Sequence, residues 1–227
     1  MQQRPFILIH SPLLGPLTWQ PVADSLRAQG YEALTPELID RLDGDVPLWA
    51  QQVASVDLPD AGAILVGHSG AGALLPAIGE RLDAQAYIFV DAALLFEPAT
   101  RLEMMHAEDR DYGREFERFL TAGGHFPNWE DAQLRDIIPD GDLRQRLLAD
   151  MRPRVLSFFT ERIEVPAGWD AKPCAYIQLS DTYGFYADQA AARQWPVVRR
   201  SAHHFEMLTQ PAAIADLLVQ MRQRLDG

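Results

Sequence analysis

The chain has little cysteine, no excess of basic residues and no long apolar run, and each deficit excludes a class of protein. Its one cysteine, Cys174, excludes an internal disulfide, and without a CxxC spacing we expect it to be a small buried thiol. Lys and Arg number 20 against 32 Asp and Glu, a formal net charge of −12, which disfavours nucleic acid or an anionic membrane surface as a partner. No stretch is long and apolar enough for a transmembrane helix, and no basic segment precedes an apolar one at the N-terminus. We therefore expect a cytoplasmic protein that does not bind membranes.

Length and composition predict a single domain. A chain of 227 residues with 48% hydrophobic residues can bury most of its surface in one core. The sequence contains no Gly/Ser-rich linker, charge block, internal repeat or low-complexity tract that would divide it.

Short apolar runs alternate with helical patterns along most of the chain. The expected strands are residues 6–10, 31–34, 63–66, 86–90, 174–179 and 197–200. The expected helices are residues 19–28, 70–82, 183–194 and 211–225. This alternation predicts an α/β fold, with a mostly parallel sheet covered by helices on both faces.

Between residues 94 and 170 the alternation stops. Helix-like segments at 102–120, 130–138, 142–151 and 154–162 are separated by glycines and prolines, and no convincing strand is present. The sequence predicts a helical insertion at 94–170, within a core formed by residues 1–93 and 171–227.

A serine among small residues follows the third expected strand. Gly67, Ser69, Gly70 and Ala71 lie where the apolar run 63–66 gives way to a helical pattern. Small residues permit the sharp strand-to-helix turn, the nucleophile elbow, that exposes a serine hydroxyl at a sheet edge. The strict G-x-S-x-G pattern is not met, because alanine stands at 71.

The order of the chemical groups gives the chain a family resemblance. A strand ending in His10 comes first, then the Ser69 turn, and finally His204-Phe205-x-Met207-Leu208 followed by Pro211. This order resembles the α/β-hydrolase superfamily, in which nucleophile, acid and histidine follow one another along the chain. The resemblance implies an α/β-hydrolase fold, Ser69 as the nucleophile, and the 94–170 insertion as a helical cap that excludes water from the substrate pocket.

Two adjacent histidines compete for the role of general base. Neighbouring side chains on an extended or turn segment do not both face one site, and in the family the base precedes an aromatic or aliphatic residue. His204 precedes Phe205, so we expect His204 rather than His203 to be the base. No further ligands stand at a metal-binding spacing, and we expect neither a metal nor a cofactor.

The carboxylate partner of the histidine has two candidates. The family motif after the penultimate strand would place it where Tyr183 stands, with Asp181 two residues earlier. Asp91 directly follows the strand after Ser69, a second location that some family members use. We favour Asp91 over Asp181, while a strand-end aspartate that only caps a backbone amide is the alternative.

The expected oxyanion hole, the donors that stabilise negative charge on an attacked carbonyl, lacks one donor. Gly70 N–H should supply the first, but the register of the usual motif places the second at Pro12, which has no N–H. Either a loop shift offers the N–H of Leu13, or the side chain of Ser11 or Tyr183 substitutes, or the reaction forms no ordinary oxyanion.

The insertion should complete the substrate pocket, and among its histidines His125 is the one expected to line it. The combined prediction is a hydrolase that acts through an acyl-enzyme on a small or medium uncharged ester, thioester or lactone. A lyase or cyclase that reuses the serine and histidine for proton transfer is one alternative, and a non-catalytic binder of small ligands is the other.

Overall fold

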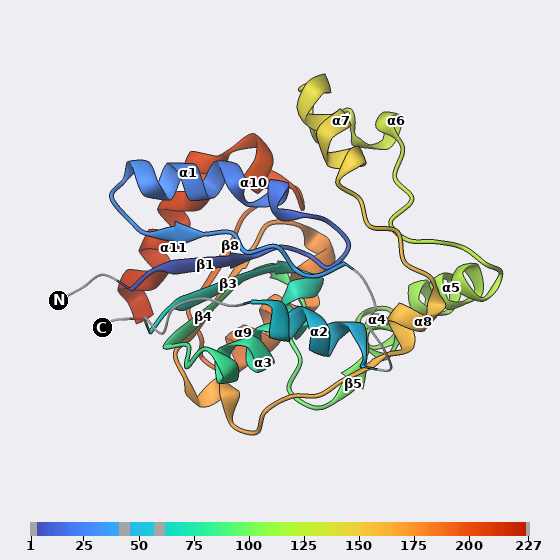
Figure 1. Ribbon diagram of the computed structural model, residues 1–227, viewed down its shortest axis with the longest axis horizontal. Helices are drawn as coiled ribbons and strands as arrows, with labels where there is room; N and C mark the ends of the chain where they lie inside the picture. The colour runs from blue at the N-terminus through green and yellow to red at the C-terminus, as the bar shows by residue number, and fades with distance from the viewer. Residues whose placement is uncertain (1–3, 41–45, 57–61, 226–227) are drawn as a thin grey trace.

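The computed structural model describes residues 4–40, 46–56 and 62–225, and its centre is a six-stranded parallel sheet (Figure 1). The strand order is β2-β1-β3-β4-β7-β8, and every pairing within this sheet is parallel. The strands are β1 (Phe6–Ile9), β2 (Ala33–Leu34), β3 (Ile64–Ser69), β4 (Ala86–Ala92), β7 (Cys174–Gln178) and β8 (Val197–Arg199). The expected parallel sheet is confirmed, with strand ends that differ by one to three residues.

Helices cover both faces of the sheet (Figure 1). One face carries α1 (Gln20–Ala28), α10 (Glu206–Thr209) and α11 (Pro211–Leu225). The other carries α2 (Leu48–Ser55), α3 (Leu75–Arg81) and α9 (Gly184–Ala192). The 3-10 helices η1 (Pro16–Thr18), η2 (Gly70–Ala73), η3 (Trp169–Ala171) and η4 (Asp181–Tyr183) lie in the connections.

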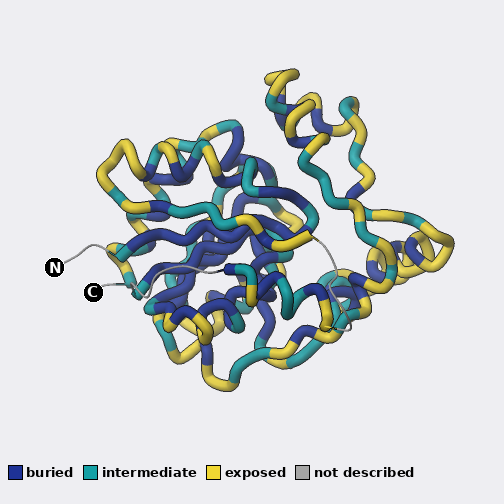
Figure 2. Tube along the Cα trace, viewed as in Figure 1, coloured by how far each residue is buried: buried dark blue, intermediate teal, exposed yellow. Residues whose placement is uncertain are grey.

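The strands are apolar on both sides because both sides are covered. Along β1, Phe6 and Leu8 belong to the core cluster that includes Leu26 of α1, whereas Ile7 belongs to the cluster on the α3 side that includes Ile78. Figure 2 shows the result as a continuous buried layer through the centre of the molecule.

The inserted segment, residues 94–170, extends from one side of the sheet (Figure 1). It contains α4 (Arg101–Glu108), α5 (Arg110–Thr121), α6 (Asp131–Leu134), α7 (Gly141–Ala149) and α8 (Leu156–Thr160). The expectation of no strand here was wrong, because β5 (Ala99–Thr100) and β6 (Arg162–Ile163) form an antiparallel pair. Two residues per strand are too few to produce a readable alternation.

Two expected helices are interrupted. The helix expected at 102–120 ends at Glu108 and restarts because Asp109 caps α5, accepting hydrogen bonds from the N–H groups of Asp111 and Tyr112. The helix expected at 70–82 begins as η2 and becomes α3 only from Leu75. The short helices α2 and α10 were not predicted.

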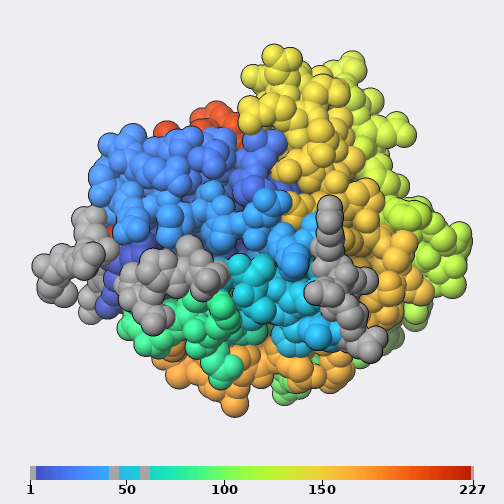
Figure 3. Space-filling view, viewed as in Figure 1, coloured from blue at the N-terminus to red at the C-terminus, as the bar shows by residue number. Residues whose placement is uncertain are grey.

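Hydrogen bonds connect the inserted segment to the loop that follows β1. The N–H of Arg152 donates to the carbonyl of Leu13 at 2.9 Å, and Arg154 donates to the carbonyl of Pro12 at 3.2 Å. On the same loop, the N–H of Gly15 donates to the Asp150 carboxylate at 2.9 Å. Figure 3 shows this part of the insertion packed against the N-terminal part of the chain.

Across the described ranges, no helix combines the length and apolar character that crossing a bilayer requires.

Candidate active site

The end of β3 forms a strained turn that presents Ser69. Ser69 has φ 57° and ψ −130°, a backbone conformation that residues other than glycine rarely adopt. Close packing explains the small neighbours: a Cβ on Gly67 would lie 2.9 Å from the Leu75 side chain, and one on Gly72 would lie 2.0 Å from the carbonyl oxygen of Ala93. Ser69 therefore stands at a sharp junction of strand and helix, as the sequence predicts.

A bulge in β4 positions Asp91 beside this turn. His68 pairs with Val90 and Ser69 with Ala92, so Asp91 is an extra residue in its strand, and its φ is +44°. Its side chain is fully buried.

The Asp91 carboxylate is surrounded by hydrogen-bond donors. One oxygen accepts the N–H groups of Leu179, at 2.8 Å, and Ser180, at 3.0 Å. The other accepts the Ser180 hydroxyl at 2.7 Å and Nδ1 of His204 at 2.8 Å. Burial opposes ionisation of Asp91, but the bonds from His204 and Ser180 outweigh it and hold its pKa below the ordinary value. Asp91 is therefore ionised and fixes the tautomer of His204.

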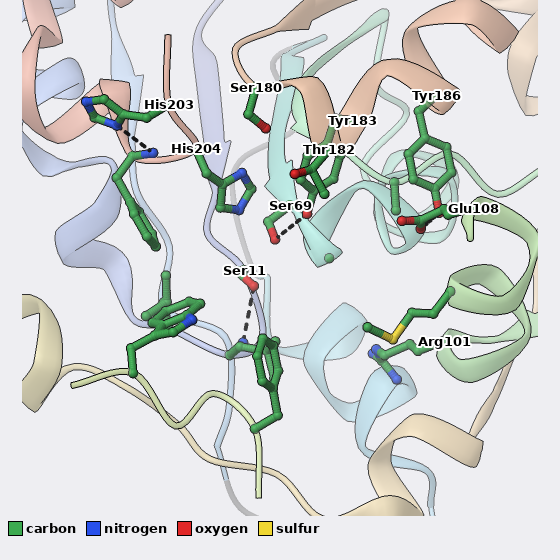
Figure 4. A pocket seen from close by; sticks show the side chains of 18 of the residues that line it. Ser11, Ser69, Arg101, Glu108, Ser180, Thr182, Tyr183, Tyr186, His203 and His204 are labelled. Atoms are coloured by element: carbon green, nitrogen blue, oxygen red, sulfur yellow. Dashed lines mark hydrogen bonds between the residues drawn. The ribbon is translucent and has the colours of Figure 1, made fainter. Parts of the chain in front are cut away.

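His204 lies between two aromatic rings. Its imidazole stacks on Tyr183 with an interplanar angle of 4° and a centroid distance of 4.9 Å, and the ring of His68 lies 4.3 Å away on a tilted plane. His68 donates from Nε2 to the carbonyl of His204 at 3.0 Å. Complete burial holds the pKa of His68 well below its ordinary value, so His68 is neutral. With Nδ1 bound to Asp91, the remaining edge of His204 faces Ser69 (Figure 4).

Of the rival candidates, His203 lines the cavity but its hydrogen bonds go to other groups, and Asp181 is not part of the lining. Nδ1 of His203 accepts the N–H of Phe205 at 3.2 Å, and its Nε2 lies 3.1 Å from the hydroxyl of Thr209, so this ring caps the start of α10. Burial lowers the pKa of His203, although the nearby Glu206 opposes that effect. Asp181 is exposed at the start of η4. The structure thus brings Ser69, His204 and Asp91 together.

The Ser69 hydroxyl is paired with Tyr183. Their oxygens lie 3.1 Å apart, and within the described chain no hydrogen bond joins Ser69 to His204. Burial raises the pKa of Tyr183, so its phenol keeps its proton and can donate.

The loop after β1 carries two of the expected donor candidates, the N–H of Leu13 and the hydroxyl of Ser11. The N–H of Leu13 donates to Oγ of Ser11 at 3.3 Å, so Leu13 is already engaged. Ser11 is buried, its hydroxyl is turned toward Ser69 (Figure 4), and a Cβ built on Gly70 would lie 3.8 Å from it.

His10 stabilises the loop after β1 through two hydrogen bonds. Its Nε2 accepts the N–H of Leu38 at 3.0 Å, which leaves the proton on Nδ1 to donate to the carbonyl of Ser11 at 2.9 Å. Burial lowers the pKa of His10 to about 4, so the ring is neutral at pH 7.

A cavity of about 570 Å³ opens over Ser69. His125 lies exposed outside it, and Phe126 and Trp129 of the same segment line it instead. The rings of Trp129 and Phe205 meet edge to face at 5.3 Å, which turns this segment inward.

Sequence reasoning missed Arg101, Glu108 and Tyr186, three polar residues of the cavity lining. The available signal was the spacing of residues 101, 104, 105 and 108, which places them on one helix face.

Comparison with known proteins gives a family and a fold. A family model described as "Alpha/beta hydrolase family" matches residues 6–217. No curated protein sequence matches significantly. An extracellular alpha/beta-hydrolase from a Paenibacillus species is 21% identical, with a TM-score of 0.76 over 96% of this chain and 99% of that one.

Two further solved structures share the fold. Tomato methylketone synthase I is 13% identical, with a TM-score of 0.71 over 99% of this chain and 100% of that one. A polyneuridine aldehyde esterase mutant is 15% identical, with a TM-score of 0.70 over 97% and 99% of the two chains. At these identities the likeness establishes the fold alone.

Proposed function

Because this chain belongs to the alpha/beta hydrolase family, we propose that it is a serine hydrolase that cleaves a small or medium ester, thioester or lactone through an acyl-enzyme. The observation that carries the proposal is the 2.8 Å hydrogen bond between His204 and the buried Asp91 carboxylate, directly beside the strained turn at Ser69.

In this mechanism Nε2 of His204 accepts the proton of Ser69 as its oxygen attacks the carbonyl carbon. Asp91 stabilises the imidazolium that forms, and the stacked ring of Tyr183 presents its π face to the same cation. The imidazolium then protonates the leaving group. Water activated by the same histidine releases the acid and regenerates Ser69.

Because Pro12 has no N–H, other donors must stabilise the negative charge on the attacked carbonyl oxygen. The first N–H of η2, that of Gly70, has no partner inside its own short helix. Ser11 accepts from Leu13 and so keeps its own hydroxyl proton for the oxyanion. Tyr183, released from Ser69 when the serine attacks, is a further donor.

The inserted segment acts as a cap in this proposal. Its side chains Phe126, Trp129 and Phe159 line the cavity together with Ser69 and His204. An apolar wall with few polar groups excludes water and accommodates the carbon chain of a substrate.

A fluorophosphonate probe tests the proposal, because it labels only an activated serine. The wild type should be labelled and should hydrolyse p-nitrophenyl esters, whereas Ser69→Ala should do neither and keep its circular dichroism spectrum. Ser157→Ala removes an exposed hydroxyl of α8 and serves as the matched control that stays labelled. A folded wild type that resists the probe contradicts the mechanism.

One observation favours a second candidate, a lyase or cyclase. Ser69 is bonded to Tyr183 rather than to His204, so the three side chains could hold and transfer protons without forming an acyl-enzyme. A structure named as a methylketone synthase shares this fold. Absence of labelling together with absence of ester hydrolysis would favour this candidate, or a non-catalytic binder of small ligands.

A further inference from the structure

Helix α4 turns one face toward the cavity, and that face has a cation at its beginning. Arg101, Met104, Met105 and Glu108 all line the cavity, at the spacing of one helix face. Arg101 and Glu108 are separated by about 10 Å along the helix axis, since each residue rises about 1.5 Å. Figure 4 shows Ser69 between His204 on one side and Arg101 on the other.

Arg101 is buried but only partly paired. It is 8% exposed. Its Nη1 donates to the carbonyl of Phe158 at 3.1 Å, and the guanidinium lies 3.8 Å from the centre of the Phe158 ring. Its ion pair with Glu161 is long, at 3.9 Å, and that carboxylate also accepts the N–H of Leu48 at 3.0 Å.

Two nitrogens of Arg101, Nε and Nη2, have no hydrogen-bond partner among the described residues. These two atoms form one edge of the guanidinium, and their N–H groups point in parallel. That edge matches the two oxygens of a carboxylate in distance and direction.

The protein environment does little to stabilise this cation. Burial lowers the pKa of Arg101 to about 9, with Glu161 opposing the effect and Arg154 adding to it, so the charge persists at pH 7. Arg101 also stands at the first position of α4, where the helix dipole disfavours a positive charge. A bound anion would stabilise the Arg101 cation against both effects, its burial and its place at the helix N-terminus.

We propose that Arg101 binds a carboxylate of the substrate, so that the preferred substrates are esters with a free carboxylate remote from the scissile bond, such as monoesters of dicarboxylic acids. The ester part of this inference rests on the proposed function, and the carboxylate part does not. It replaces the uncharged substrate expected from the sequence.

A ligand can reach Nε and Nη2 of Arg101 only if neighbouring side chains move. Neither atom is reached by solvent in the structure. Met104 and Met105 line the same wall, and methionine is unbranched and changes rotamer at little cost. Glu108, at the other end of the face, accepts a hydrogen bond from the Tyr186 hydroxyl, and burial raises the pKa of its carboxyl.

The test measures binding without turnover. The Ser69→Ala protein is titrated calorimetrically with monomethyl succinate, adipate, suberate and sebacate, and with the methyl alkanoates of matching chain length. At least one monomethyl dicarboxylate should bind about 10- to 100-fold more tightly than its neutral partner, the range of a charge-assisted hydrogen-bonded pair.

Arg101→Met in the Ser69→Ala background should abolish this preference, and Arg101→Lys should retain part of it as a point charge. Arg144→Met is the matched control, because Arg144 is an equally buried arginine of the insertion that pairs with Asp131 at 2.6 Å and does not line the cavity. It should keep the full preference.

Equal affinity for acidic and neutral esters in the parent protein overturns the inference, even if Arg101→Met fails to fold. An acid preference that survives Arg101→Met also overturns it. If the wild type hydrolyses neutral esters without any acid preference, the hydrolase proposal stands and this one fails. If the acid preference depends on Arg101 but the wild type hydrolyses no ester, the carboxylate-binding inference stands and the hydrolase proposal fails.

Discussion

Replacing Asp91 by asparagine separates the charge of this residue from its size. The asparagine oxygen can still accept the N–H groups of Leu179 and Ser180. The new amide NH₂ then faces the two donors that the other carboxylate oxygen accepted. The Ser180 hydroxyl can rotate to become an acceptor, but Nδ1–H of His204 cannot. His204 must therefore move its proton to Nε2, the atom that should receive the proton of Ser69.

The expected effects on turnover and on stability differ greatly. A histidine in the wrong tautomer lowers kcat by about 10⁴-fold in the best-studied triad, and we expect a loss of that order here. Stability loses one hydrogen bond to a charged group, about 2 kcal/mol, because the backbone bonds and the packing volume are retained. Asp91→Asn should thus be folded and almost inactive.

The assay is ester hydrolysis and the rate of fluorophosphonate labelling, with urea unfolding followed by circular dichroism. Asp181→Asn provides the matched control, since Asp181 is exposed and should be dispensable. If Asp91→Asn keeps more than about a tenth of the wild-type kcat, the tautomer argument is wrong. If Asp181→Asn is the inactive variant, the acid lies in the loop after β7.

Three further predictions follow from the site. His204→Ala should lower kcat about 10⁴-fold while His203→Ala stays within about tenfold, and the reverse order in stopped-flow assays would show that the other ring faces Ser69. Ser11→Ala should lower kcat about 10²-fold with little change in KM, and an unaffected kcat would remove Ser11 from the oxyanion hole. Because the folded pKa of His10, about 4, lies below its ordinary 6.5, its contribution to stability is complete above pH 6.5 and is lost as the pH falls toward 4. Urea titrations of the wild type should show the free energy of unfolding falling by about 3 kcal/mol between pH 6.5 and pH 4 from this group, and this part of the fall should be absent in His10→Gln. The same pH dependence in His10→Gln and the wild type would contradict the burial argument.

The parallel sheet and the serine turn could be predicted because their signals are local. Apolar runs identify buried strands, and the small residues at 67, 70 and 71 identify a turn without knowledge of any distant contact. The cavity lining depends instead on how the inserted segment packs. Phe126 rather than His125 faces inward because it belongs to an aromatic cluster with Phe116 and Phe159, which are distant in sequence.

The environment of Asp91 could not be derived from its own neighbours. Its donors Leu179 and Ser180 are about 90 residues away and meet it because β4 and β7 are adjacent in the sheet. The bulge that turns Asp91 toward His204 leaves no mark in the sequence. The same holds for Leu13, whose N–H is engaged by a serine hydroxyl in the same loop. The catalytic roles assigned to these residues stay predictions.

The positive φ angles of Ser69 and Asp91 imply a conflict between activity and thermodynamic stability. Each such non-glycine residue destabilises the native fold by about 1–3 kcal/mol, and of the four in the described chain two, Ser69 and Asp91, are candidate catalytic groups, while Asp83 and Gln194 lie outside the site. Glycine at position 69 would relieve one strain, offset by about 1 kcal/mol through the greater freedom of the unfolded chain, and would remove the nucleophile. Selection for a more durable protein alone would therefore act against the residue that its chemistry requires.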